Sequence, residues 1–154
     1  MQLFIIFAHI QIDRFMSTIF SKIISGEIPA YKVAESNDFL AFLDIAPLTC
    51  GHVLVIPKKE TDYIFDIDDE EYQSMWIFAK IVSQGIKKVM SCPKVGVAVV
   101  GLEVAHAHIH LIPLNTVSDM NFEKPKLSLS AIEMDKIATE IRNAILDITT
   151  SAKM

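Results

Sequence analysis

Three histidines alternate with apolar residues in one short run of this chain, and no other feature limits the fold as strongly. His106, His108 and His110 are separated by Ala107 and Ile109. Successive side chains of a β-strand point to opposite faces, so residues two apart share a face. The run therefore predicts a strand that carries three imidazoles on one face. Its opposite face would enter the core through Ala105, Ala107, Ile109 and Leu111.

The rest of the chain alternates short apolar runs with segments of helical period. In chain order, the expected elements are a short helix after Ser17, strands over 31–35, 39–44 and 52–56, a long helix opened by the acidic run 68–71, strands over 95–100 and 105–112, and a last helix over about 130–148. Strands joined in hairpins favour antiparallel pairing. The predicted fold is α+β, with a five-stranded, mostly antiparallel sheet, a long central helix, a short N-terminal helix and a C-terminal helix.

The length of 154 residues suits one domain with one core. An apolar run over 3–10 is too short to span a bilayer. No basic residue precedes it, as one would in a signal peptide. We expect 1–15 to be an N-terminal extension, consistent with a misassigned start before Met16, and 16–154 to form the domain.

Charge and cysteine content narrow the class of partner. The formal net charge of −5 argues against a nucleic-acid partner. Cys50 and Cys92 are the only cysteines, and their spacing matches neither a disulfide scaffold nor a zinc finger. We expect both to be reduced, small buried residues of a cytoplasmic protein that does not bind membranes.

The alternating histidines have three interpretations from the residues alone. They could form an exposed strand face without a function. They could share a zinc ion, because a catalytic zinc commonly takes three protein ligands. They could also supply a metal-free nucleophile, with one imidazole attacking and its neighbours donating hydrogen bonds to the anion under attack.

Further motifs favour the nucleophile. The run 106–110, followed by Leu111 and Ile112, resembles the signature of the histidine triad family of nucleotide hydrolases and transferases. The segments 18–29, 42–47 and 51–58 are similar, in the same order, to the family's first helix, its ribose-contacting segment and its central strand. The resemblance covers about 16–114, and it is closest to the bacterial nucleotide-binding and nucleoside phosphoramidase branch.

This resemblance implies a role for each histidine. His108 would attack the α-phosphorus of a nucleotide and form a nucleotidyl-histidine intermediate, which water would then hydrolyse. His110 and His52 would face the phosphate from either side and help to neutralise it. His106 would orient His108 through its backbone carbonyl, which fixes the ring nitrogen that attacks. No cofactor or metal is required by this scheme.

The resemblance also implies the contacts to the rest of the substrate. Asp44 would accept hydrogen bonds from the two ribose hydroxyls. An apolar slot for a purine base would be formed by Ile19, Phe20, Ile23, Leu43 and Ile45. Read singly, each of these apolar residues is an ordinary core candidate.

Two departures from the family concern the leaving group and a structural zinc. Glu103 stands where many relatives carry a hydroxyl residue, and its charge would repel a phosphate. It therefore either points away or meets a cationic leaving group such as an amine. Some bacterial relatives bind zinc through cysteines flanking Ile-Phe in the first helix. In this chain Ser17 and Ser21 look like the residues at those two positions, so we expect no zinc there.

The leading hypothesis is a phosphoramidase that releases AMP. The alternatives are a dinucleoside polyphosphate hydrolase, a nucleotide-binding regulatory module with incidental turnover, and a zinc-dependent hydrolase. A small-molecule nucleotide is the expected partner. The family resemblance further implies a homodimer, formed by the long helix and the strand after it, because 95–100 would otherwise be an uncovered edge.

Overall fold

The computed structural model describes residues 17–152, so the predicted extension over 1–15 lies outside the described residues. The helices are α1 (Ile19–Ser25), α2 (Asp69–Val89) and α3 (Ala131–Ser151). The strands are β1 (Lys32–Glu35), β2 (Phe39–Leu43), β3 (Val53–Pro57), β4 (Lys94–Ala98) and β5 (Ile109–Leu114). Two short 3-10 helices, η1 (Ile64–Asp66) and η2 (Val117–Met120), lie in connecting segments. These elements confirm the predicted α+β class.

The five strands form one sheet in the order β1-β2-β3-β5-β4. Every neighbouring pair is antiparallel. Strand β5 is therefore an interior strand, hydrogen-bonded to β3 on one side and to β4 on the other. Strand β4 forms one edge of the sheet, as predicted for the segment after the long helix.

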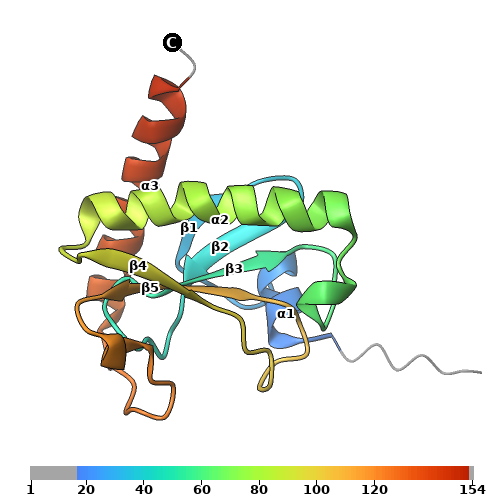
Figure 1. Cartoon of the computed structure of the whole chain (residues 1–154), viewed down its shortest axis with the longest axis horizontal. Helices are drawn as coiled ribbons and strands as arrows, with labels where there is room; N and C mark the ends of the chain where they lie inside the picture. Colours follow the sequence, from blue (N-terminus) through green and yellow to red (C-terminus); the bar gives the residue numbers. More distant parts are fainter. Residues whose placement is uncertain (1–16, 153–154) are drawn as a thin grey trace, which may run out of the picture.

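Helices cover both faces of the sheet (Figure 1). Alternate residues of β2, β3 and β5 pack against α2 and α3 in the larger core cluster. The other residues of β2 and β3 pack with Phe20 and Ile23 of α1 in a smaller cluster. The central strands β2, β3 and β5 are thus buried on both faces, and their period-two pattern decides which side chains meet α1.

Local sequence explains where the helices begin and end. Thr18, rather than Ser17, caps α1, since its side chain accepts from the backbone N–H of Ser21. Gly26 ends α1 at φ 82°, a left-handed conformation that glycine adopts readily. Ser130 and Glu133 form a capping box at the start of α3. Helix α3 continues to Ser151, three residues beyond the predicted end.

The histidine-bearing strand is shorter than predicted, because β5 begins at Ile109 rather than at 105. Strand β3 ends at Pro57, which has no N–H to donate, and the backbone N–H of Ala107 donates to Thr61 O instead of to a strand. The alternation nevertheless persists, since Ala107, Ile109 and Leu111 all enter the larger core. Ala105 does not, because it lies in the exposed connection before this segment.

The two cysteines differ in environment. Cys92 is buried, as predicted, but Cys50 is exposed, so the prediction was wrong for Cys50. The reason is that Cys50 lies in the turn before β3 and not in a strand. Separately, no helix within residues 17–152 is long and apolar enough to cross a membrane.

Candidate active site

Four histidines gather at the sheet face that α1 covers. His110 lies on β5 opposite Leu54 of β3, and His52 comes directly before β3. His106 and His108 lie in the extended segment that leads into β5. Their exposed fractions are 1% for His52, 0% for His106, 6% for His108 and 8% for His110. Such burial excludes an exposed strand face without a function.

Hydrogen bonds fix the ring of His106 at both nitrogens. Its Nε2 lies 2.8 Å from the backbone oxygen of Pro57. A carbonyl oxygen only accepts, so this nitrogen carries a proton. Its Nδ1 lies 3.2 Å from Thr18 Oγ1. The ring is therefore held between β3 and the start of α1.

The same reasoning assigns the reactive atom of His108. Its Nδ1 lies 2.7 Å from the backbone oxygen of His106, so this nitrogen is the donor. In the neutral ring the lone pair is then on Nε2, which makes no hydrogen bond within the described residues. The edges of Phe20 and His110 pack against this ring, with centroids 5.2 Å and 4.8 Å away. His108 is thus a buried imidazole with a free, oriented nucleophilic nitrogen.

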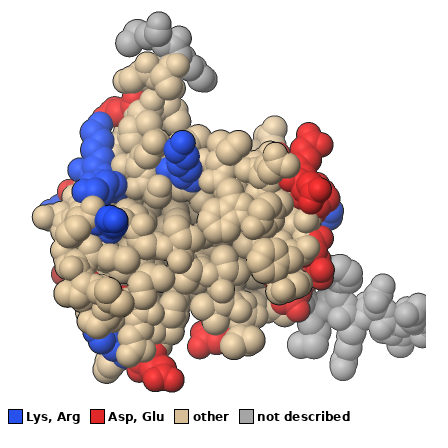
Figure 2. Space-filling view, in the orientation of Figure 1, with Lys and Arg blue, Asp and Glu red and all other residues tan. Residues whose placement is uncertain are grey.

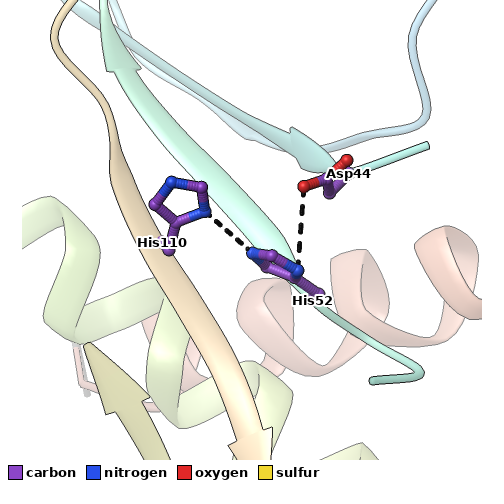
Figure 3. A group of neighbouring side chains, drawn as sticks. All are labelled: Asp44, His52 and His110. Atoms are coloured by element: carbon purple, nitrogen blue, oxygen red, sulfur yellow. Dashed lines mark hydrogen bonds and ion pairs between the residues drawn. The ribbon is translucent and has the colours of Figure 1, made fainter. Parts of the chain in front are cut away.

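His52 and His110 form a directed pair (Figure 3). The backbone N–H of Leu48 donates to His52 Nδ1 at 3.2 Å, so the proton of neutral His52 is on Nε2. That Nε2 lies 3.0 Å from His110 Nδ1 and donates to it. The proton of neutral His110 is consequently on its own Nε2, which has no acceptor among the described residues. His110 is therefore a preset donor beside His108.

This arrangement changes the expected position of His52. Both of its ring nitrogens are occupied within the protein, so it cannot donate to a phosphate, contrary to the expectation that it faces the phosphate. Its contact with the other histidines is the hydrogen bond that it donates to His110 Nδ1. The physical reason is its place directly before β3, where the preceding turn puts the backbone N–H of Leu48 against His52 Nδ1.

Burial keeps this pair neutral. Desolvation, with smaller contributions from Lys126 and His108, lowers the pKa of His52 from 6.5 to about 4. Desolvation, followed by the charges of His108 and His52, lowers the pKa of His110 to about 3. Near pH 7 both rings are neutral, as the hydrogen-bond directions above require. The 3.7 Å contact between His52 Nδ1 and Asp44 Oδ2 is then not an ion pair.

These pKa values predict how stability depends on pH. The unfolded chain binds protons at His52 and His110 below about pH 6.5, whereas the folded chain does so only near pH 4 and 3. The free energy of unfolding should therefore fall as the pH drops from 6.5 towards 4, by roughly 1.4 kcal/mol per pH unit for each histidine. Urea unfolding at pH 7, 6 and 5 measures this slope. An equally steep slope in a His110→Asn variant would contradict the assignment.

Within residues 17–152, one group of side chains has the spacing of metal ligands, because the ligand atoms of Asp44, His52 and His110 lie within 4.8 Å of one another. Their hydrogen bonds do not fit this role, because His52 Nδ1 and His110 Nδ1 already accept from N–H donors. His106 is likewise occupied at both nitrogens. The three alternating histidines therefore do not present converging lone pairs to one zinc ion.

The residues proposed for a base slot divide between two faces of the sheet. Phe20 and Ile23 pack in the smaller cluster beside the histidines. Ile19, which precedes Phe20 on α1, has a side chain that is 46% exposed. Leu43 does not join them, because alternation along β2 turns it into the core under α2 and α3. Phe42 occupies the histidine face instead. Ile45 is 74% exposed in the following turn.

Two acidic candidates lie at the edge of the site. Asp44 follows β2, and its Oδ1 accepts from the backbone N–H of Ala46 at 2.9 Å. Its other oxygen faces His52 and is available to a hydroxyl donor. Glu103 is exposed in the connection between β4 and β5, and it makes no hydrogen bond or ion pair with the described residues.

Two residues near the histidines were missed by the sequence reasoning. The ring of Phe122 packs edge-on against His110, with centroids 4.9 Å apart. Lys126 is close enough to lower the pKa of both His52 and His110, and its ammonium lies 5.6 Å from the Phe122 ring centroid. One sequence feature could have pointed to Phe122, because it is the one aromatic residue in the polar stretch 115–130.

Comparison with known proteins identifies the family. The sequence model of one protein family, the HIT domain, matches residues 25–117, which include the histidine run and His52. The chain belongs to the HIT family. Among curated HIT relatives, an uncharacterized HIT-like protein of Borreliella burgdorferi is 36% identical over 80% of this chain and 94% of its own length. An adenosine 5′-monophosphoramidase of Schizosaccharomyces pombe is 34% identical over 84% of this chain and 99% of its own.

Solved HIT structures share the fold. A Hit-like protein involved in cell-cycle regulation from Bartonella henselae has a TM-score of 0.72 at 30% identity, covering 83% of this chain and 96% of its own. A zinc-bound histidine triad protein from Mycobacterium smegmatis has a TM-score of 0.73 at 26% identity, covering 88% and 98%. In the present HIT chain, the two residues that flank Ile19-Phe20 are Thr18 and Ser21. The expectation that Ser17 stands at one of the places of the zinc-binding cysteines was therefore wrong, and Thr18 stands there instead.

Proposed function

We propose that this HIT protein is a nucleotide hydrolase that acts on a purine nucleoside phosphoramidate and releases AMP. The observation that carries the proposal is the free Nε2 lone pair of His108, which is held by the His106 carbonyl beside the Nε2–H of His110. A phosphoryl centre needs a nucleophile in line with its leaving group and donors aimed at its oxygens. The monophosphoramidase name of the yeast relative supports the same substrate class.

The reaction then has two displacements at phosphorus. Nε2 of His108 forms a bond to the α-phosphorus as the P–N bond breaks, and the amine takes one proton from solvent as it leaves. Nε2–H of His110 donates to a phosphate oxygen and offsets its charge. Water next attacks the same phosphorus and gives one proton to solvent, while the P–Nε2 bond breaks. AMP is thereby freed, and the lone pair returns to His108. Asp44 accepts from the ribose hydroxyls, and Phe20 and Ile23 border the base.

Lys126 favours a second candidate, a dinucleoside polyphosphate hydrolase. Its ammonium near the histidine pair would attract further phosphate groups of such a substrate. The same nucleophile would serve, and only the leaving group would differ.

The deciding measurement is the release of AMP from adenosine 5′-phosphoramidate and from diadenosine tetraphosphate, side by side, with a chelator present. Faster release from the phosphoramidate supports the proposal, whereas faster release from the tetraphosphate favours the second candidate. Turnover that disappears in chelator would contradict a metal-free nucleophile. Binding of AMP without turnover of either compound would indicate a nucleotide-binding module.

We further propose that two copies pair through α2 and β4. Figure 2 shows a broad, mostly uncharged face, with acidic and basic side chains gathered at its opposite sides. Ile77 is 62% and Val97 46% exposed, and the buried indole N–H of Trp76 lacks a partner within the described residues. An antiparallel pair of α2 helices would bring the acidic first turn of one copy near Lys87 and Lys88 of the other. Sedimentation equilibrium should give a dimer mass, and Val97→Lys should shift it towards the monomer.

A further inference from the structure

A row of polar side chains leads from His106 away from the reacting nitrogen, Nε2 of His108. The proposed reaction does not use this row. Thr18 Oγ1 lies 3.2 Å from His106 Nδ1, and Ser21 Oγ lies 3.1 Å from Thr18 Oγ1. Ser21 Oγ in turn donates to Glu60 Oε2. The start of α1 and the segment after β3 thus meet at this ring.

The number of protons in this row is informative. Three contacts join the four groups, and each hydrogen bond needs one proton. The hydroxyls of Thr18 and Ser21 supply two, while the Nε2 proton of His106 is committed to Pro57. If all three contacts are hydrogen bonds, the row holds a third proton, either on Nδ1 of His106 or on the carboxyl group of Glu60. Three hydrogens that shift together along the row convert one arrangement into the other.

We propose that Thr18, Ser21 and Glu60 form a relay that shares one proton with His106 and thereby positions the nucleophile His108. Ring contacts at both nitrogens hold residue 106 in place, and its carbonyl oxygen accepts the Nδ1–H of His108. A displacement of this carbonyl would turn the His108 ring away from its line of attack. The effect on turnover rests on the proposed function, whereas the shared proton does not.

The charges around His106 are consistent with the relay. Burial lowers the pKa of His106, and the Pro57 carbonyl and the Glu60 carboxylate oppose this shift. Among the described residues, His108 is the other charged or titratable group that acts on His106, and it also lowers this pKa. Positive charge on His108 during attack favours the arrangement in which the shared proton is on Glu60 rather than on His106. Two adjacent cationic rings are thereby avoided.

Ser21→Ala and Glu60→Gln test the relay, with Asp62→Asn as the matched control. Ser21→Ala keeps the backbone N–H that bonds to Thr18, so the cap of α1 survives. Asp62 is exposed two residues after Glu60 and makes no side-chain hydrogen bond or ion pair with the described residues. The readouts are the ring-nitrogen NMR titration of His106, and kcat and KM for adenosine 5′-phosphoramidate.

Both relay variants should lower the pKa of His106 and reduce kcat on the order of tenfold, with KM nearly unchanged. The Asp62→Asn protein should match the wild type in all three quantities. A His106 pKa that is unchanged in Glu60→Gln would overturn the relay, even if kcat fell. A wild-type protein that does not hydrolyse the phosphoramidate would overturn the proposed function instead, and the NMR titration would still judge the relay.

Discussion

A His108→Ala protein should lose phosphoramidate turnover on the order of 10⁴-fold or more, because no other described imidazole presents a free lone pair at that point. His110 cannot replace it, since its Nδ1 accepts from His52 and its Nε2 carries the proton. Steady-state release of AMP measures the loss. Affinity for AMP should change little, because the proposed base and ribose contacts are intact.

A covalent intermediate gives this prediction a second measurement. Rapid quenching of the wild-type reaction should yield a peptide containing His108 with an added adenylyl group, detected by mass spectrometry. The same peptide from His108→Ala should be unmodified. Turnover by His108→Ala at the wild-type rate, or an adenylyl group on a different residue, would reject the assigned nucleophile.

The second large effect concerns the direction of the His52–His110 hydrogen bond. In His52→Leu, His110 Nδ1 loses its donor, so the proton of His110 is no longer confined to Nε2. The donor that faces the developing negative charge would then be lost in part of the molecules. We expect kcat for adenosine 5′-phosphoramidate to fall about 100-fold, a typical result for loss of one such donor.

Thr49→Val is the matched control for His52→Leu. Thr49 lies in the same turn, but its hydroxyl donates to the Pro113 carbonyl and not to a histidine. Its kcat should stay within a few-fold of the wild type. If His52→Leu retained wild-type kcat, the tautomer of His110 would have to be set by the substrate rather than by the protein.

Periodicity predicted most of the fold, because the same alternation that suggested the strands also decides which residues enter each core. The alternation correctly predicts that Ala107, Ile109 and Leu111 point into the larger core. It failed at Ala105, because pairing ends where Pro57 cannot donate and Ala107 bonds to Thr61. Strand limits depend on such long-range partners, which a local pattern does not contain.

The site was less accessible to sequence reasoning. The family resemblance points to His52, yet the orientation of its ring depends on the Leu48 N–H, which only the folded turn supplies. The same resemblance places Leu43 in the base slot, but its neighbour Phe42 occupies the histidine face. Glu60 and Thr18 carried no signal, because they are distant in sequence from His106 and from each other.

Main-chain atoms make the decisive contacts to three of the four rings: Leu48 N–H to His52, the Pro57 carbonyl to His106, and the His106 carbonyl to His108. Substitution at a position does not delete its backbone group. The orientation of these rings can therefore survive extensive drift in the surrounding side chains, provided that the path of the chain is kept.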